Sequence, residues 1–192
     1  KRTLVLEKPV RLVDVSGMTD EIQVGTSWKN EYDAAVIKSI LMSDDAVRRL
    51  LNLLPAARVI VISPYTAQIQ FLKRELKRIE FVASGDIATV DSFQGQEGDI
   101  VVVSPTRTSS VEFFDDNRLN VALTRAKHLL IVVADVNYLN TPGAGGSALA
   151  RFVRFACTHK IIERARVDTA WSRPDWDTTT KWTTSITSRC HG

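Results

Sequence analysis

The stretch FQGQEGD, residues 93–99, places polar and flexible residues between two apolar runs. Gly95 and Gly98 let the backbone approach another group closely, because glycine has no Cβ atom. The two glutamines supply neutral hydrogen-bond donors and acceptors, and Glu97 supplies a carboxylate. These groups could hold a ligand, but polar, glycine-rich turns also serve simply to connect two strands. The composition of the stretch leaves both interpretations open.

Arg118 and Arg125 form a second candidate group, because they stand seven residues apart in the segment RLNVALTRA. In a helix that turns about 100° per residue, they would fall within roughly 20° of each other. The segment 115–127 therefore predicts a helix with one cationic face. Arginines on such a face are often only solvated. A guanidinium is also a planar, permanent charge of the kind that phosphoryl transfer requires, so the spacing leaves both roles open.

Strand and helix patterns alternate through the segments that must position these residues. Apolar runs predict strands at residues 10–17, 57–63, 87–93, 99–104 and 128–135. Helical spacing predicts a long helix that Ser27 caps and Pro55 ends, and shorter helices at 65–79, 115–127 and 148–159. The alternation indicates an α/β fold with a mainly parallel sheet and helices on both faces.

Ligands of such sheets gather at the carboxyl ends of the strands. We expect residues 63–65, 91–99 and 104–108 to lie there.

The composition fits one globular domain. Of the 192 residues, 44% are apolar, which supplies a core for a domain over residues 1–160, followed by a polar, Thr/Ser/Trp-rich tail over 161–192. The net charge of +3 permits a polyanionic partner. The two cysteines, Cys157 and Cys190, lack metal-ligand spacing, so we expect no metal site. The cysteine usage also suggests no disulfide framework, so we expect a reducing location inside the cell, in the cytoplasm or nucleus. No apolar run approaches a membrane span, so we expect no membrane partner.

The opening stretch belongs to a longer pattern. VDSFQGQEGDIVVVS (90–104) and NRLNVALTRAK (117–127) resemble motifs V and VI of superfamily 1 helicases, and VISPYTAQIQFL (61–72) resembles their motif IV. The similar branch includes the nonsense-mediated-decay helicase, the immunoglobulin-mu-binding helicase, senataxin and the nidoviral helicases. The match runs from about Arg11 to Asp135 and covers the second of the family's two RecA-like domains. The resemblance implies a RecA-like, P-loop NTPase-type three-layer sandwich.

The resemblance also implies a nucleotide-binding set. In motif V, Gln94, Gly95 and Glu97 match positions that meet the nucleotide, the carboxylate accepting from the ribose. In motif VI, Arg125 matches the arginine finger that reaches the γ-phosphate, with Arg118 beside it. Some relatives carry a second arginine just after the motif IV glutamine, where this chain has isoleucine, so we expect Arg125 to act without that helper.

A further set matches positions that touch the nucleic-acid strand. It comprises Pro64, Tyr65 and Thr66 in motif IV, Thr89 and Asp91 around the start of motif V, and Thr106 and Arg107 in a loop suited to phosphate contact.

We therefore interpret the chain as the C-terminal RecA-like half of an ATP-dependent RNA or DNA helicase. Its expected partners are single-stranded RNA or DNA and the first RecA-like domain, and its expected cofactors are ATP and Mg²⁺. No glycine here precedes a lysine, so the chain has no phosphate-binding P-loop, and TDEIQ (19–23) only mimics a metal-binding acid pair. We expect the first domain to hold the metal and this chain alone to be inactive. The alternative is a catalytically inactive, helicase-like module that binds nucleic acid or a partner protein.

Overall fold

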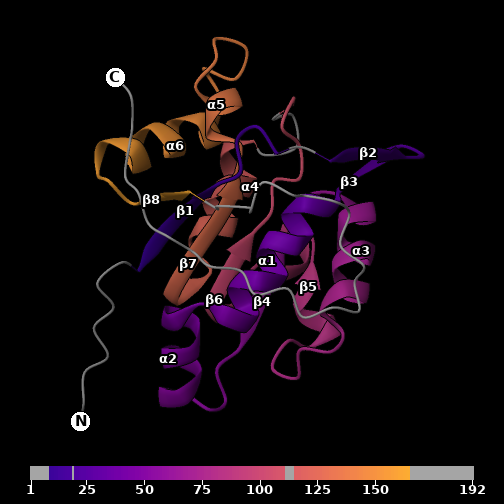
Figure 1. The fold of residues 1–192 in the computed structure, drawn as a ribbon, viewed down its shortest axis with the longest axis vertical. Helices are drawn as coiled ribbons and strands as arrows, with labels where there is room; N and C mark the ends of the chain where they lie inside the picture. The colour runs from indigo at the N-terminus through magenta and orange to yellow at the C-terminus, as the bar shows by residue number, and fades with distance from the viewer. Residues whose placement is uncertain (1–8, 19, 111–114, 165–192) are drawn as a thin grey trace.

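A computed structural model describes residues 9–18, 20–110 and 115–164 of the chain. Its centre is a six-stranded sheet in the order β5-β4-β6-β7-β1-β8, and every pair of neighbouring strands is parallel (Figure 1). The strands are β1 (Val10–Asp14), β4 (Val59–Ile62), β5 (Ile87–Ala88), β6 (Gly98–Val103), β7 (Ala126–Ala134) and β8 (Ile162–Arg164). The predicted parallel α/β sheet is confirmed.

Helices cover both faces of this sheet. One face carries α1 (Glu31–Ser43), α2 (Asp45–Leu53) and α3 (Thr66–Leu76), and the other carries α4 (Asp116–Leu123), α5 (Val136–Leu139) and α6 (Ala148–Thr158). Side chains alternate along the buried strands, so that Ile100 and Val102 of β6 join one apolar cluster while Val101 and Val103 join the other. The result is the three-layer sandwich that the motifs imply.

The long helix predicted to start at Ser27 is wrong in two respects. Ser27 lies in β3 (Ser27–Asn30), which pairs antiparallel with β2 (Glu21–Val24) in a hairpin that projects from the body (Figure 1). Asn30 caps α1 instead, because its side-chain oxygen accepts a hydrogen bond from the backbone N–H of Asp33 at 3.0 Å.

The same predicted helix is also divided at Asp44. Asp44 has extended backbone angles, and its carboxylate accepts from the N–H groups of Ala46 and Val47, which starts α2. Arg11 of β1 forms a 2.7 Å ion pair with Asp44, so the break is also tied to the sheet. Aspartate competes well for this role because its short side chain reaches the free N–H groups of a new helix.

The described chain ends in a strand. β8 pairs with β1 beyond residue 160, so the sheet extends past the expected end of the domain. The rest of the expected tail, 165–192, lies outside the described residues. Within the described ranges, no helix is long and apolar enough to cross a membrane, and no cluster of three or more His, Cys, Asp or Glu side chains could hold a metal ion.

Candidate nucleotide and nucleic-acid interface

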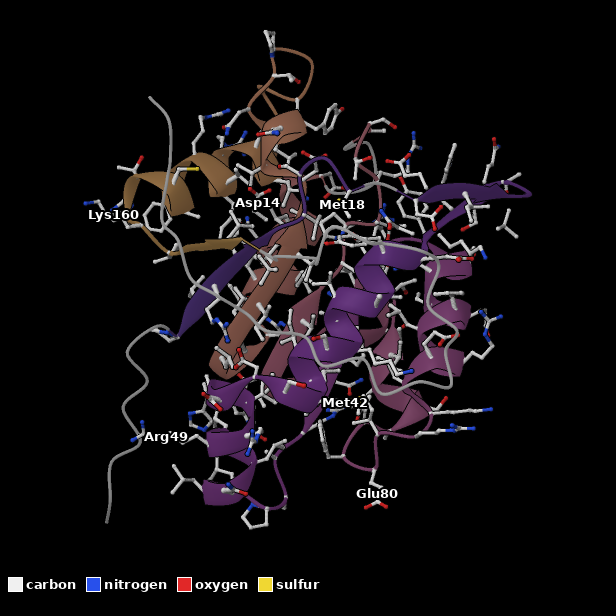
Figure 2. The ribbon with its side chains drawn as sticks, in the orientation of Figure 1. Asp14, Met18, Met42, Arg49, Glu80 and Lys160 are labelled. Carbon is white, nitrogen blue, oxygen red and sulfur yellow. The ribbon has the colours of Figure 1, made fainter. Side chains whose placement is uncertain are left out.

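Most residues of the two predicted sets lie at opposite ends of the parallel strands, but Asp91 of the nucleic-acid set forms an ion pair with Arg118 of the nucleotide set, between the turn after β5 and α4. Pro64, Thr89 and Thr106 follow the carboxyl ends of β4, β5 and β6, which point upward in Figure 2 toward the labelled Asp14. The loop that contains Gln96 precedes β6. This loop therefore lies at the amino ends of the strands.

The expectation that residues 91–99 all lie at the carboxyl ends was wrong. β5 has only two residues, and the chain then forms a 3₁₀ turn, η2 (Val90–Phe93). Val90 and Phe93 are buried in the cluster beneath α4, so this segment crosses a face of the sheet from one end to the other. It delivers Gln94 to the amino end of β6.

Arg125 lies beyond the helix on which it was predicted. α4 ends at Leu123, and β7 begins at Ala126. The guanidinium donates from Nε to the carbonyl of Val121 at 3.0 Å and from Nη2 to Oγ1 of Thr124 at 3.1 Å. Its Nη1 donates to the carbonyl of Gln96 at 3.2 Å.

These three acceptors are neutral. In the part of the chain that the structure describes, Arg125 has no carboxylate within ion-pair distance, so its charge is held in place without being neutralised. Arg118 stays on α4, where it forms a 3.6 Å ion pair with Asp91. The predicted single cationic face is therefore absent, because the helix ends before Arg125.

The loop beside Arg125 is open to solvent. Gln94, Gly95 and Glu97 are exposed, and the Glu97 carboxylate lies 3.7 Å from Nζ of Lys127. Gly95 has a φ of +78°, a conformation that favours glycine, and no heavy atom lies within 4 Å of where a Cβ would stand. Gly98 serves packing instead, since a Cβ there would lie 2.9 Å from the side chain of Ile60.

The carboxyl edge is the edge of the sheet where the strands end and where Pro64, Thr89 and Thr106 lie. It exposes only some of the residues predicted to touch the nucleic-acid strand. Thr66 is exposed at the start of α3, and its hydroxyl lies 3.3 Å from Oγ of Ser27 in the hairpin. Pro64 and Thr89 are half-buried. The side chain of Tyr65 is directed into the core, with only 4% of the residue exposed.

Thr106 and Arg107 make internal contacts that their sequence did not reveal. Thr106 is buried with a φ of +73°, and its hydroxyl lies 2.9 Å from Oγ of Ser63. Arg107 donates from Nε to Glu21 at 3.0 Å and lies 3.8 Å above the ring of Trp28. The Thr106 hydroxyl thus has no path to an external strand, and the Arg107 guanidinium is engaged by the hairpin.

Glu21 fastens the hairpin to this loop. Burial alone would raise the pKa of Glu21. Hydrogen bonds from the Thr108 hydroxyl, the Thr108 N–H and Ser109, together with the positive charge of Arg107, outweigh the effect of burial and lower this pKa. Residues 21–23 of the TDEIQ segment therefore lie in a surface hairpin, and the carboxylate of Glu21 is engaged within the chain.

A buried polar network lies beneath the carboxyl edge, and sequence reasoning missed it. Gln68 of α3 accepts from the N–H of Asn30 at 2.8 Å and donates to its carbonyl at 3.1 Å. Ser104 donates to Asp33 at 3.2 Å, while the second carboxylate oxygen of Asp33 has no hydrogen-bond partner among the residues that the structure describes. Burial raises the pKa of Asp33 to about 8, against the lowering effect of hydrogen bonds from Ser104 and the Thr106 backbone.

Comparison with known proteins identifies the family. The profile of a family described as AAA domain matches residues 1–137. The chain belongs to this family. This AAA domain is 34% identical over 166 residues to an uncharacterised ATP-dependent helicase of Methanocaldococcus jannaschii, covering 85% of this chain and 24% of the relative. It is 37% identical over 165 residues to helicase sen1 of Schizosaccharomyces pombe, covering 82% and 9%.

A third relative is regulator of nonsense transcripts 1 of Dictyostelium discoideum, which is 29% identical over 155 residues, covering 75% of this chain and 11% of the relative. The AAA domain thus belongs to the superfamily 1 helicase branch predicted from motifs IV to VI. The chain spans at most 24% of the length of these three relatives.

Proposed function

We propose that this AAA domain is the C-terminal RecA-like half of an ATP-dependent helicase, in which it supplies the arginine finger and part of the single-strand surface. The observation that carries the proposal is the position of Arg125. Its guanidinium donates to three neutral acceptors beside an exposed, glycine-containing loop, and among the described residues it has no ion-pair partner. A fixed cation of this kind stabilises the charge that develops on a transferred phosphoryl group.

The amino edge is the edge of the sheet where the strands begin and where the loop before β6 lies. Its exposed groups could contact one side of a nucleotide. Glu97 can accept from a ribose hydroxyl because it is exposed, and Gly95 leaves space for a close approach to the backbone. Arg118 lies in the first turn of α4, where Asp91 partly engages its charge, so we assign it a supporting contact. ATP supplies the phosphoryl group when it is bound, and Mg²⁺ would be held by the first RecA-like domain.

The carboxyl edge would meet a single strand of RNA or DNA. Pro64, Thr66 and Thr89 offer accessible groups there, while Tyr65 and Thr106 are buried and would support this edge from within rather than touch the strand. The separation of the two edges supports nucleotide binding at one edge and strand binding at the other. A movement of the whole domain on nucleotide binding would then also move the edge that binds the strand. A helicase of this kind would work in the cytoplasm or nucleus, where its RNA or DNA substrates are.

Steady-state phosphate release with and without a single strand tests the proposal. The chain alone should be inactive, and hydrolysis should appear when the chain is joined to the first RecA-like domain to form the two-domain enzyme. Ordinary turnover by the chain alone would contradict a split site. No turnover by a folded two-domain enzyme would favour the inactive, helicase-like module.

A further inference from the structure

An arginine that no sequence motif singled out, Arg58, lies at the amino end of β4. Its backbone N–H donates to the carboxylate of Asp99 at 2.8 Å, and its carbonyl accepts from the N–H groups of Asp99 and Ile100 at 2.8 and 3.2 Å. These bonds fix the Arg58 backbone against the first residues of β6. The side chain is 37% exposed, so the guanidinium stands at the surface of the amino edge.

Asp86 orients this guanidinium. Nε and Nη2 of Arg58 donate to the same carboxylate oxygen of Asp86 at 2.8 and 2.6 Å. Charge-assisted bonds to a planar fork fix direction as well as distance. The side chain of Asp86 is only 17% exposed, so its position is itself well supported.

Thus oriented, Arg58 reaches the loop that precedes β6. Nη2 donates to the side-chain oxygen of Gln96 at 2.8 Å, and Nη1 approaches the carbonyl of Glu97 at 3.5 Å. The Gln96 side chain also donates to the carbonyl of Ser92 at 3.0 Å. Both ends of the Gln96 side-chain amide are therefore engaged, which holds the residue on the surface of the molecule.

Gln96 is also the residue whose backbone carbonyl accepts from Arg125. The other two acceptors of that guanidinium, Val121 and Thr124, belong to its own segment of the chain. Among the described residues, the Gln96 carbonyl is thus the only hydrogen-bond acceptor of the Arg125 guanidinium that comes from another segment. The preceding Gly95 has a positive φ, and no described heavy atom beyond its chain neighbours lies within 4 Å of where its Cβ would stand.

We propose that Arg58 is a positioning residue that acts through Gln96 to aim the Arg125 guanidinium at the nucleotide. This role rests on the function proposed above. Arg58 need not touch the nucleotide, because its hydrogen bonds fix the acceptor on which Arg125 depends. Its loss should slow hydrolysis more than it weakens nucleotide binding, since small misplacements of a catalytic group lower the rate strongly.

Kinetics of the two-domain enzyme test this role. Arg58→Ala should lower kcat by about tenfold, with little change in the affinity for a non-hydrolysable ATP analogue. Arg58→Lys should fall between Ala and wild type, because one ammonium cannot bridge Asp86 and Gln96 as a planar fork does. Arg49→Ala is the matched control, since Arg49 is an exposed arginine on α2 (Figure 2). It should leave kcat unchanged.

A double-mutant cycle with Gln96→Ala separates this route from others. Gln96→Ala keeps the backbone carbonyl but removes the side chain that Arg58 holds. If Arg58 acts through that side chain, the double variant should be no slower than the slower single variant, within about twofold. Fully multiplicative losses would show that Arg58 acts by another route and would overturn the proposal.

Side-chain NMR gives a readout that does not depend on hydrolysis. In the arginine-labelled 192-residue chain, the Nε–Hε signal of Arg125, assigned with Arg125→Lys, should show a lower heteronuclear NOE in Arg58→Ala but not in Arg49→Ala. The turnover of Arg125→Ala is also measured in the two-domain enzyme, beside that of the Arg58 variants. An inactive Arg125→Ala beside a fully active Arg58→Ala would overturn only the positioning role. Normal turnover by Arg125→Ala would overturn the proposed function, and the positioning role with it.

Discussion

The guanidinium carbon of Arg107 lies 3.8 Å from the centre of the Trp28 ring, and this contact joins the β2–β3 hairpin to the loop after β6. Both residues belong to segments that are far apart in the sequence. The ion pair between Arg107 and Glu21 at 3.0 Å strengthens the same junction. The hairpin is therefore fastened to the carboxyl edge rather than free.

A double-mutant cycle should measure this junction. Trp28→Ala and Arg107→Ala should each lower the free energy of unfolding, and their coupling energy should be about 1 kcal/mol, because the stacked guanidinium is largely shielded from water. Urea unfolding of the four proteins provides the measurement. A coupling energy near zero would show that the stacking contributes nothing in solution.

Asp33 should make the stability of the chain depend on pH. Burial raises its pKa from 3.8 to about 8, so the folded chain keeps a proton that the unfolded chain releases. The contribution of Asp33 is fully present below about pH 4 and is lost as the pH rises toward 8. The slope can reach about 1.4 kcal/mol per pH unit for one proton.

The Asp33→Asn variant tests this dependence, because asparagine resembles the protonated carboxyl group. The free energy of unfolding of Asp33→Asn minus that of wild type should rise between pH 5 and 8 and then level off. Urea titrations across this range measure the difference. A difference that stays constant with pH would mean that Asp33 is ionised in the folded chain.

The glycines should differ in their tolerance of alanine. Gly98→Ala should lower stability by about 1–3 kcal/mol, because its Cβ would meet the buried Ile60 side chain. Gly95→Ala should cost about 1–2 kcal/mol through its positive φ. Gly85→Ala is the control, since Gly85 has open surroundings and no positive φ. Thermal unfolding of the three variants measures these losses, and a Gly85→Ala variant that loses as much stability as the other two would contradict the prediction.

The apolar patterns predicted most of the sheet. VIVI at β4 and the valines of β6 are buried on both faces, so their hydrophobicity alone identifies them as central strands of a parallel sheet. The resemblance to motifs IV, V and VI then predicted which polar segments between these strands carry site residues. Neither pattern indicates how far a strand extends, which explains why the predicted strand at 87–93 shortens to β5.

The errors arose where side chains that are distant in the sequence decide the local structure. Asn30 caps α1 because the hairpin holds Ser27 in a strand. α4 ends before Arg125, whose carbonyl accepts from the Gly98 N–H at 3.0 Å and so joins the start of β7 to β6 instead of continuing the helix. Arg58 carries no local signal either, because its partners come from other elements.

Single-strand binding by the chain should be weak, indifferent to sequence and reduced by salt. If the carboxyl edge meets the sugar-phosphate backbone, the logarithm of the binding constant should fall linearly with the logarithm of the salt concentration. The slope should be about −0.7 for each phosphate that the chain neutralises. Thr66→Glu should weaken binding further, because Thr66 is exposed on that edge at the start of α3, whereas Ser43→Glu, at the exposed C-terminal end of α1, should not. Fluorescence anisotropy with a labelled strand measures both. Tight, salt-independent binding would point to another surface.

Paired measurements on Arg125 test the central claim most directly. ATP turnover and equilibrium binding of a non-hydrolysable analogue are compared for wild type, Arg125→Ala and Arg125→Lys in the two-domain enzyme. Arg125→Ala should lower turnover on the order of a thousandfold while analogue affinity changes far less, because the guanidinium meets charge that grows during transfer. Lysine should not restore turnover, since it lacks the planar fork. Normal turnover by Arg125→Ala would show that Arg125 is only a solvated surface residue and would contradict the account.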